Sequence, residues 1–182
     1  MKTQAHVVVI GGGVVGVGTL YSLVKRGCQD CVLIERRELT SGSTWHAAGL
    51  LPLFNMSYSV GQIHKYSVNL YGALEEETGQ HVGFRRVSNI RLARTADRWD
   101  EYQYYKGVAD TLGIRVNLLT PQDVKEIWPL AETDGLLGAI QHPDDGYIQP
   151  ADLTQAMAIG ARQGGAEIYR NTTVGGIERV GD

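Results

Sequence analysis

The feature that most constrains the fold is a glycine-rich turn directly after a short apolar run near the N-terminus. His6 to Ile10 is a β-branched run typical of a buried parallel strand, and Gly11, Gly13 and Gly16 then follow the pattern G-x-G-x-x-G. In this pattern the first glycine makes the tight turn, the second lets the backbone approach a pyrophosphate, and the third lets the next helix pack closely. The residues therefore predict a strand, turn and helix that bind a dinucleotide.

The residues after the turn complete the same unit. A helix is expected from about Val14 to Arg26, and its unpaired N-terminal amides and dipole favour the phosphates without a lysine. Cys31 to Ile34 predicts the second strand, which ends at Glu35, nineteen residues after Gly16. A carboxylate at this spacing accepts hydrogen bonds from a ribose diol and repels a 2′-phosphate. The pattern therefore favours NAD or FAD over NADP.

The choice between these two cofactors depends on the next segment. An ordinary NAD domain continues to its next helix and strand within a few residues. Residues 40–51 instead spell TSGSTWHAAGLL, in which small and hydroxyl side chains permit close backbone approach to a flat ring and Trp45 offers an aromatic wall. This segment indicates a flavin cradle and favours FAD.

With these residues the chain resembles the amine-oxidising flavoproteins typified by dimethylglycine and sarcosine dehydrogenases, within the wider D-amino acid oxidase group. The match is strongest over GSTWHAAGL and continues through IHKYSVNLYGALEEETGQHVGF, SNIRLA and DGYIQPADLTQAMAIGARQGGAEI. The resemblance implies an α/β fold: a Rossmann-like FAD-binding domain of the GR2 (D-amino acid oxidase) type, incomplete, with part of an inserted α+β substrate domain.

The resemblance also implies which residues contact the cofactor. These are Gly11, Gly13, Val14, Val15, Gly16, Glu35, Arg36, Gly42, Ser43, Thr44, Trp45, His46, Ala47, Ala48, Gly49, Leu50 and, at the adenine, Val174. In the family the histidine of the WHAAG segment is joined covalently to the flavin, and the matching residue is His46. Without the resemblance, a lone loop histidine is more often a packed residue with a satisfied ring nitrogen.

The implied reaction is oxidation of a small N-methyl secondary or tertiary amine, such as dimethylglycine or sarcosine, by hydride transfer to FAD. Water or tetrahydrofolate then captures the iminium product. The electron acceptor is open, and no catalytic residue is nominated, because the substrate-binding groups are expected beyond residue 182. Two alternatives stay open: a fragment of an NAD-dependent dehydrogenase, and a truncated FAD-domain remnant without catalysis.

Three segments are expected along the chain. Residues 1–80 form the first FAD-binding segment, 81–135 begin the inserted region, and 136–182 return to the FAD-binding domain. The chain as a whole is expected to be a fragment of a longer enzyme and to be inactive by itself. Further helices are expected at 58–78, 97–112, 120–128 and 150–164, and strands at 84–93, 166–169 and 172–180.

Composition excludes several classes of function. The net charge of −3 and pI near 5.9, without a Lys/Arg cluster, argue against a nucleic-acid partner, and no apolar stretch is long enough for a membrane span, so a cytoplasmic enzyme is expected. No metal is expected, since Cys28 and Cys31 form C-x-x-C without a second ligand pair. The stretch from His142 to Tyr147 is interpreted as a turn, because adjacent aspartates before glycine are common turn formers.

Overall fold

The computed structural model describes residues 1–181, which form two compact units. Unit 1 comprises Met1–Gly49, Tyr71–Gly83 and the described residues from Ile148 onward, and unit 2 comprises Leu50–Leu70 and Phe84–Tyr147. This division does not coincide with the three expected segments, because residues 50–70 and 136–147 belong to unit 2. The chain thus leaves unit 1 and returns to it twice.

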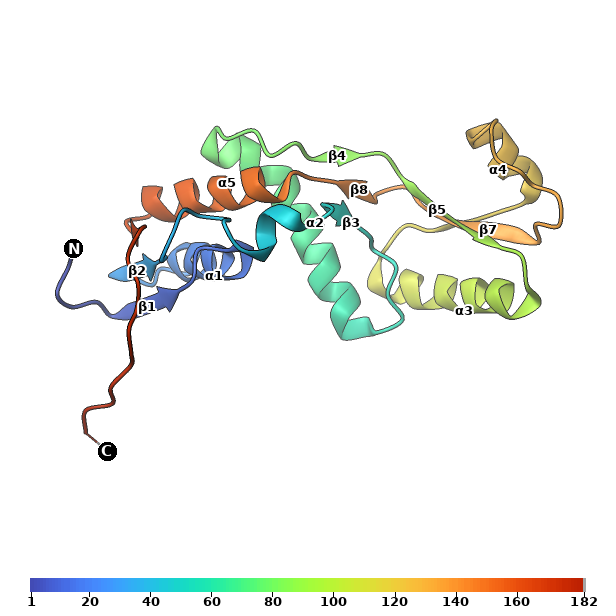
Figure 1. The fold of residues 1–182 in the computed structure, drawn as a ribbon. Helices are drawn as coiled ribbons and strands as arrows, with labels where there is room; N and C mark the ends of the chain where they lie inside the picture. The colour runs from blue at the N-terminus through green and yellow to red at the C-terminus, as the bar shows by residue number, and fades with distance from the viewer. Residues whose placement is uncertain (182) are drawn as a thin grey trace. The chain divides into compact units, whose positions relative to one another are not determined.

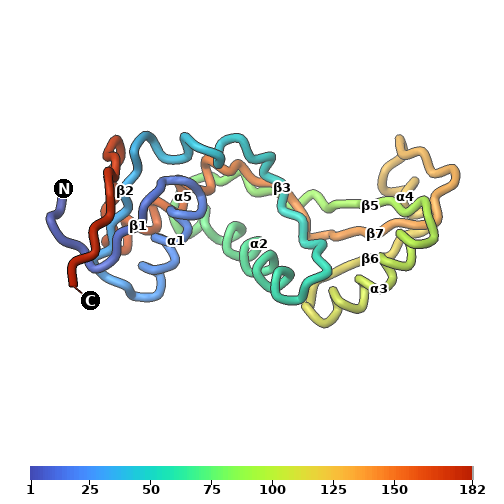
Figure 2. Tube along the Cα trace, turned by 60° about the horizontal axis from the view of Figure 1, so that its bottom comes forward, coloured from blue at the N-terminus to red at the C-terminus, as the bar shows by residue number. Residues whose placement is uncertain are grey.

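Unit 1 contains a three-stranded parallel sheet with the order β1–β2–β9. The strands are β1 (Val7–Ile10), β2 (Cys31–Ile34) and β9 (Glu167–Tyr169), and β2 lies in the middle. Figure 2 shows the red end of the chain returning beside β2, where Val32 pairs with Glu167. The observed bounds of β1, β2 and β9 are close to the predicted ranges. The parallel pairing of β1 with β2 confirms the expected βαβ arrangement.

Two helices, α1 (Val14–Lys25) and α5 (Pro150–Gln163), pack against each other in unit 1 (Figure 1). Glycines allow this close approach. A Cβ added to Gly160 would lie 2.7 Å from Cε2 of Tyr21, and one on Gly164 would lie 2.2 Å from Cγ1 of Val24. The two helices therefore contact each other where α5 carries no side chain, which buries residues such as Leu20 completely.

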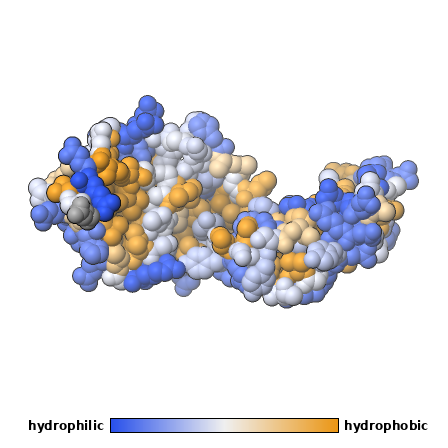
Figure 3. Space-filling view, turned by 90° about the horizontal axis from the view of Figure 1, so that it is seen from below, coloured by the Kyte–Doolittle hydropathy of each residue, from blue (hydrophilic) through white to orange (hydrophobic). Residues whose placement is uncertain are grey.

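The outer side of β1 is only partly covered. Val8 is 49% exposed and Ile10 is 53% exposed, whereas β2 is largely buried. Figure 3 shows the resulting hydrophobic surface over unit 1. The expectation of a buried first strand is therefore wrong within residues 1–181, because Val7 and Val9 are only half-buried and Val8 and Ile10 are exposed.

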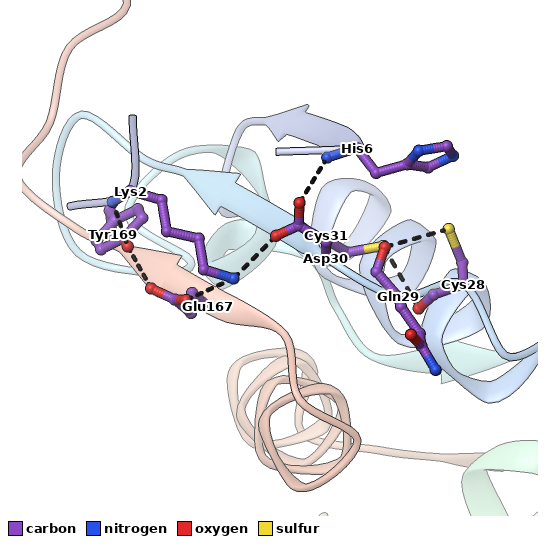
Figure 4. A network of polar contacts seen from close by, with 8 residues as sticks. All are labelled: Lys2, His6, Cys28, Gln29, Asp30, Cys31, Glu167 and Tyr169. Atoms are coloured by element: carbon purple, nitrogen blue, oxygen red, sulfur yellow. Dashed lines mark hydrogen bonds and ion pairs between the residues drawn. The ribbon is translucent and has the colours of Figure 1, made fainter. Parts of the chain in front are cut away.

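Polar contacts join the N-terminus to the strand ends in unit 1 (Figure 4). Lys2 Nζ lies 2.9 Å from Asp30 Oδ1 and 2.8 Å from Glu167 Oε1. Nearby, the Cys31 thiol is buried, and burial together with its hydrogen bond to Cys28 raises its pKa to about 11. Such a thiol is a poor nucleophile, so Cys31 acts as a packing residue. No three His, Cys, Asp or Glu side chains in the described chain are grouped to hold a metal.

Unit 2 contains two small antiparallel sheets. One has the order β5–β7–β6, formed by β5 (Asn89–Ala93), β7 (Gly138–His142) and β6 (Asn117–Leu119). The other has the order β3–β8–β4, formed by β3 (Leu50–Leu51), β8 (Gly146–Tyr147) and β4 (Arg85–Arg86). Strand β7 is central in the first sheet although no strand was predicted there.

The helices of this unit begin and end at recognisable caps. Helix α3 (Ala96–Leu112) starts where the Thr95 side chain accepts from the Arg98 amide, and it ends at Gly113, whose φ is +63°. Helix α4 (Pro121–Ile127) has the capping box that its sequence predicts. Helix α2 (Tyr58–Thr78) contributes residues to both units, with the division after Leu70.

The core of unit 2 lies between α3 and the β5–β7–β6 sheet. It includes the buried residues Leu53, Val68, Ala93, Tyr102, Tyr105, Ala109, Leu112, Ile114, Val116 and Ile140. Trp99 packs against this cluster, and a Cβ on Gly138 would lie 2.6 Å from its ring. The expectation that Trp99, Tyr102 and Tyr105 are packing residues is confirmed.

Two predicted strands differ from the structure. The strand expected at 84–93 is divided into β4 and β5, because Ser88 has a φ of +70° and both Val87 and Ser88 donate their amides to the Asp145 carbonyl. The strand expected at 172–180 is wrong, since this stretch pairs with no strand of the described chain. Within residues 1–181 no helix has the length and apolar content that crossing a bilayer requires.

Candidate functional site

The candidate site lies in unit 1, where β1 and β2 end and α1 begins. Gly11 turns the chain with a φ of +111°, and its amide donates to the Ile34 carbonyl at 2.9 Å. A Cβ on Gly16 would lie 2.0 Å from the Gly11 carbonyl oxygen. The first and third motif glycines are thus required for the turn and for close packing, as the motif predicts.

Gly12, which lies between them, is also crowded, although by side chains and not by backbone. A Cβ there would lie 2.7 Å from Cδ2 of Leu39 and 2.8 Å from Cγ of Glu35. Its carbonyl accepts from the Thr40 amide at 2.9 Å, and Thr40 has a φ of +67°. The loop after β2 therefore folds back directly onto the glycine turn.

Glu35 links the turn and the loop through its carboxylate. Oε2 accepts from the Gly12 amide at 2.6 Å, and Oε1 accepts from the Arg37 amide at 2.8 Å. An ionised carboxylate has about four lone-pair positions, so acceptor capacity remains on both oxygens.

The N-terminus of α1 receives one side-chain cap and keeps free amides. The Val14 amide donates to Thr44 Oγ1 at 2.9 Å, and Thr44 is 7% exposed. In residues 1–181 the amides of Gly13 and Val15 have no hydrogen-bond acceptor. Free amides at the positive end of a helix dipole favour an anion there.

Thr44 belongs to η1 (Ser43–His46), a 3-10 turn in the segment with the sequence STWHAAG. The hydrogen bond from Val14 to Thr44 joins this turn to the start of α1, thirty residues earlier. A Cβ on Gly13 would lie 3.1 Å from Thr44 Oγ1. The two motifs singled out in the sequence therefore meet at one place in unit 1.

A pocket of about 440 Å³, here named the corner pocket, lies between these segments. Its lining residues are Gly11, Gly12, Gly13, Val14, Val15, Glu35, Arg36, Arg37, Ser41, Gly42, Ser43, Thr44 and Ala47. Ten of the seventeen predicted cofactor residues line it: Gly11, Gly13, Val14, Val15, Glu35, Arg36, Gly42, Ser43, Thr44 and Ala47. The pocket combines free amides, a carboxylate and small side chains.

Trp45 and His46 lie beside the corner pocket without lining it. Trp45 is 60% exposed and His46 is also exposed, with their ring centroids 4.1 Å apart. His46 Nδ1 lies 3.1 Å from the Gly42 carbonyl oxygen. Because that oxygen only accepts, Nδ1 carries the proton in this contact and Nε2 of the neutral ring keeps a free lone pair.

The remaining predicted residues lie elsewhere. Gly16 packs behind the glycine turn, Ala48 is exposed, and Val174 is half-buried in the segment after β9. Gly49, with a φ of +74°, approaches Ile148, since its carbonyl accepts from the Ile148 amide at 2.8 Å. Leu50 begins β3 in unit 2 and pairs with Tyr147.

Three lining residues were not predicted: Gly12, Arg37 and Ser41. Gly12 occupies a variable position of the glycine motif, so its requirement arises only when Leu39 and Glu35 fold against it. Arg37 contributes its backbone amide to Glu35, which is a contact that no side-chain pattern predicts. Ser41 belongs to the hydroxyl-rich segment, and that composition was the available signal.

Comparison with known protein families gives one match over nearly the whole chain. The model of the family described as "FAD dependent oxidoreductase" matches residues 6–182. Human mitochondrial dimethylglycine dehydrogenase is 46% identical over 165 residues, which cover 91% of this chain and 19% of that protein. The 4-methylaminobutanoate oxidase (formaldehyde-forming) of Paenarthrobacter nicotinovorans is 40% identical over 182 residues, covering 100% of this chain and 22% of that protein.

The fold has a counterpart among solved structures. The L-proline dehydrogenase of P. horikoshii superimposes with a TM-score of 0.87 at 29% identity, covering 97% of this chain and 46% of that one. The expected α/β fold and the expected family resemblance are therefore confirmed. The chain spans about a fifth of the length of the two relatives above, at 19% and 22%.

Proposed function

The chain belongs to the FAD-dependent oxidoreductase family, and on that premise we propose that unit 1 binds FAD at the corner pocket. The single observation that carries this proposal is the convergence of the glycine turn and the η1 segment on one pocket of about 440 Å³. Under this proposal unit 1 is the FAD-binding domain, and unit 2 is part of the inserted substrate domain.

The glycine turn and the start of α1 fit the diphosphate of the cofactor. The free amides of Gly13 and Val15 are donors at the positive end of the helix dipole. Gly13 also leaves room for phosphate oxygens, since it lacks a Cβ. Arg36 and Arg37 line the same pocket and add positive charge.

Glu35 fits the ribose. Its carboxylate is held in place by the Gly12 and Arg37 amides at 2.6 and 2.8 Å, and it keeps acceptor capacity for two hydroxyl donors. A negative charge at this position disfavours a 2′-phosphate, so it supports FAD or NAD over NADP.

His46 is proposed as the covalent attachment point of the flavin. The contact between Nδ1 and the Gly42 carbonyl at 3.1 Å directs the proton to Nδ1 and leaves Nε2 as the nucleophilic nitrogen. The side chain is exposed and lies next to Trp45, so the lone pair is accessible to a large planar ligand. We therefore assign the link to Nε2.

The substrate proposed for the whole protein is a small N-methyl amine. This rests on the names of the two relatives, a dimethylglycine dehydrogenase and a 4-methylaminobutanoate oxidase. FAD, when bound, supplies the acceptor for a hydride from the N-methyl carbon. The segments described above bind and orient the cofactor, and the use of tetrahydrofolate as carbon acceptor is proposed only for the whole protein.

Acid precipitation tests the cofactor and its link together. The chain is expressed in medium with riboflavin, purified, precipitated with acid and washed, and flavin absorbance is measured in pellet and supernatant. We expect the colour to stay in the pellet for the parent chain. For His46→Ala we expect it to move to the supernatant, because no nitrogen holds the flavin.

His81→Ala is the matched control, since His81 is another exposed histidine of unit 1 whose ring Nδ1 lies 2.9 Å from Glu75 Oε2, away from the corner pocket. It should keep its colour in the pellet. Colour that stays with His46→Ala would contradict the link at this residue. A folded parent chain that binds NAD and takes up no flavin would contradict FAD and favour the NAD-dependent alternative.

A further inference from the structure

Unit 2 contains a second pocket, of about 270 Å³, in which positive side chains predominate. Lys65 from α2, Arg86 from β4 and Arg115 after α3 line it, with Asp144 as its one carboxylate. We name it the cationic pocket. Three separate chain segments converge here, so the excess of positive charge arises from the fold and not from a run of basic residues in the sequence.

The existing partners of these cations leave much of their hydrogen-bonding capacity free. Arg115 Nη2 lies 2.8 Å from Asp144 Oδ1, which neutralises one positive charge. Lys65 Nζ donates to the Leu112 carbonyl at 2.8 Å, a neutral acceptor. Among residues 1–181, no carboxylate pairs with Arg86, whose guanidinium lies 5.6 Å from the Phe84 ring centroid. Two positive charges therefore lack an anionic partner.

Ordered structure positions Lys65 and the backbone that leads to Arg115. Leu112 is the last residue of α3, so the Lys65 ammonium lies at the negative end of that helix. The chain then turns at Gly113, and the Ile114 amide donates to the Ala109 carbonyl at 2.9 Å. This turn fixes the start of the segment that carries Arg115.

Apolar side chains form the rest of the lining. Leu53, Val68 and Ile114 are buried, with exposed fractions of 4%, 5% and 4%. An apolar wall reduces the local dielectric response and strengthens the attraction between an anion and the cations. Asn69 also lines the pocket and adds an amide donor.

We propose that the cationic pocket binds a small dianion, in which phosphate or carboxylate oxygens accept from Arg86, Lys65 and Arg115. A dianion matches the two positive charges that Asp144 leaves unneutralised. Guanidinium groups bind both phosphate and carboxylate through paired N–H donors. The volume of the pocket limits the ligand to a compact molecule. This site lies wholly in unit 2 and is independent of FAD binding.

Isothermal titration of the full 182-residue chain tests the proposal. Inorganic phosphate and malonate serve as probes, at constant ionic strength and with chloride as the monovalent comparison. We expect saturable binding of at least one dianion and none of chloride. Saturation by phosphate alone assigns a phosphoryl ligand, saturation by malonate alone assigns a dicarboxylate, and saturation by both shows that the pocket accepts either kind of oxyanion. Absence of saturation with both probes overturns the proposal.

Two substitutions with opposite expected effects locate the site. Arg86→Gln should weaken binding about tenfold, because it removes the cation without a carboxylate partner. Asp144→Asn should tighten binding several-fold, because it releases Arg115 from its ion pair.

Arg85→Gln is the matched control. It lies one residue earlier on the same strand, is exposed, does not line the pocket, and removes the same charge. Its affinity should equal that of the parent chain. Equal losses in Arg85→Gln and Arg86→Gln would show a general charge effect and overturn the site, as would weaker binding in folded Asp144→Asn.

Discussion

The two units leave polar groups without protein partners in contrasting environments. In unit 1 these groups are the backbone amides of Gly13 and Val15, which line an open pocket. In unit 2 they are side-chain atoms in the interior, including Nδ1 of His142 and Oδ2 of Asp145. A free amide at a pocket can bind water or a ligand, whereas a buried unpaired atom raises the free energy of the folded state. The first arrangement suits the binding proposed for unit 1, whereas the second introduces two opposing pH dependences into the stability of unit 2.

Two histidines illustrate the same contrast. His46 is exposed, and its Nδ1 has a carbonyl acceptor, so its other nitrogen is available for chemistry. His142 is fully buried, with Nε2 3.4 Å from the Tyr105 hydroxyl, and burial lowers its pKa to about 4. The sequence predicted a turn from His142 to Tyr147, but His142 ends β7 and Gly146 begins β8, so the turn is limited to the residues between these strands. The role of a histidine therefore depends on its surroundings and cannot be read from the residue type alone.

The largest effect is expected where backbone meets backbone in unit 1. Gly16→Ala should destabilise unit 1 by more than about 3 kcal/mol and abolish cofactor binding, because the new Cβ would lie 2.0 Å from the Gly11 carbonyl oxygen. Denaturant unfolding followed by circular dichroism measures the change.

Gly107→Ala in helix α3 of unit 2 is its control, since a Cβ there meets no atom within 4 Å. This variant should be stabilised by about 0.5 to 1 kcal/mol. If the Gly16→Ala protein were as stable as its parent, the predicted clash with the Gly11 carbonyl oxygen would be refuted.

The next effect tests the buried polar pair of unit 2. Burial raises the Asp145 pKa from 3.8 to about 6, so its stabilisation is complete below pH 3.8 and is lost as the pH rises through 6. Burial lowers the His142 pKa from 6.5 to about 4, so its stabilisation is present above pH 6.5 and is lost as the pH falls through 4. The two dependences nearly cancel between pH 6.5 and 4. Arg91 lowers both pKa values and Asp144 raises that of Asp145.

Asp145→Asn removes one side of this balance. As the pH falls from 6.5 to 4, the free energy of unfolding of this variant should decrease by about 2 to 3 kcal/mol relative to that of the parent chain, because only the His142 dependence remains. His142→Gln should instead become more stable as the pH falls over the same range, because only the Asp145 dependence remains. Urea unfolding at several pH values gives both curves, and parallel curves for all three proteins would refute the cancellation.

A smaller effect is expected from the single side-chain cap in unit 1. Thr44→Val keeps the shape of the side chain but removes the acceptor of the Val14 amide at 2.9 Å, which should cost about 1 kcal/mol. Thr19→Val changes an exposed threonine in α1 and should lie within about 0.5 kcal/mol of the parent. Equal unfolding midpoints for both variants would show that the contact between η1 and α1 contributes nothing.

Much of the secondary structure follows from local signals. The apolar run before Gly11, the capping box at Thr120 and the periodicity after Pro150 predict β1, α4 and α5 because each depends on residues within one or two turns. Strand β7 was missed because its stability comes from pairing on both sides with β5 and β6. The segment at 172–180 shows the converse, since an apparent strand pattern forms no strand without a neighbour.

The strand–turn–helix corner could be derived from the residues alone, because turn geometry, helix dipole and the spacing to Glu35 are properties of one continuous stretch of chain. The folded chain was required to show that Thr44 caps α1, that Leu39 and Glu35 crowd Gly12, and that Lys65, Arg86 and Arg115 share one pocket. The two kinds of contact differ in the distance along the chain between the residues involved. Contacts within a few residues are dictated by local conformation, whereas contacts between distant residues depend on how the packed elements bring them together.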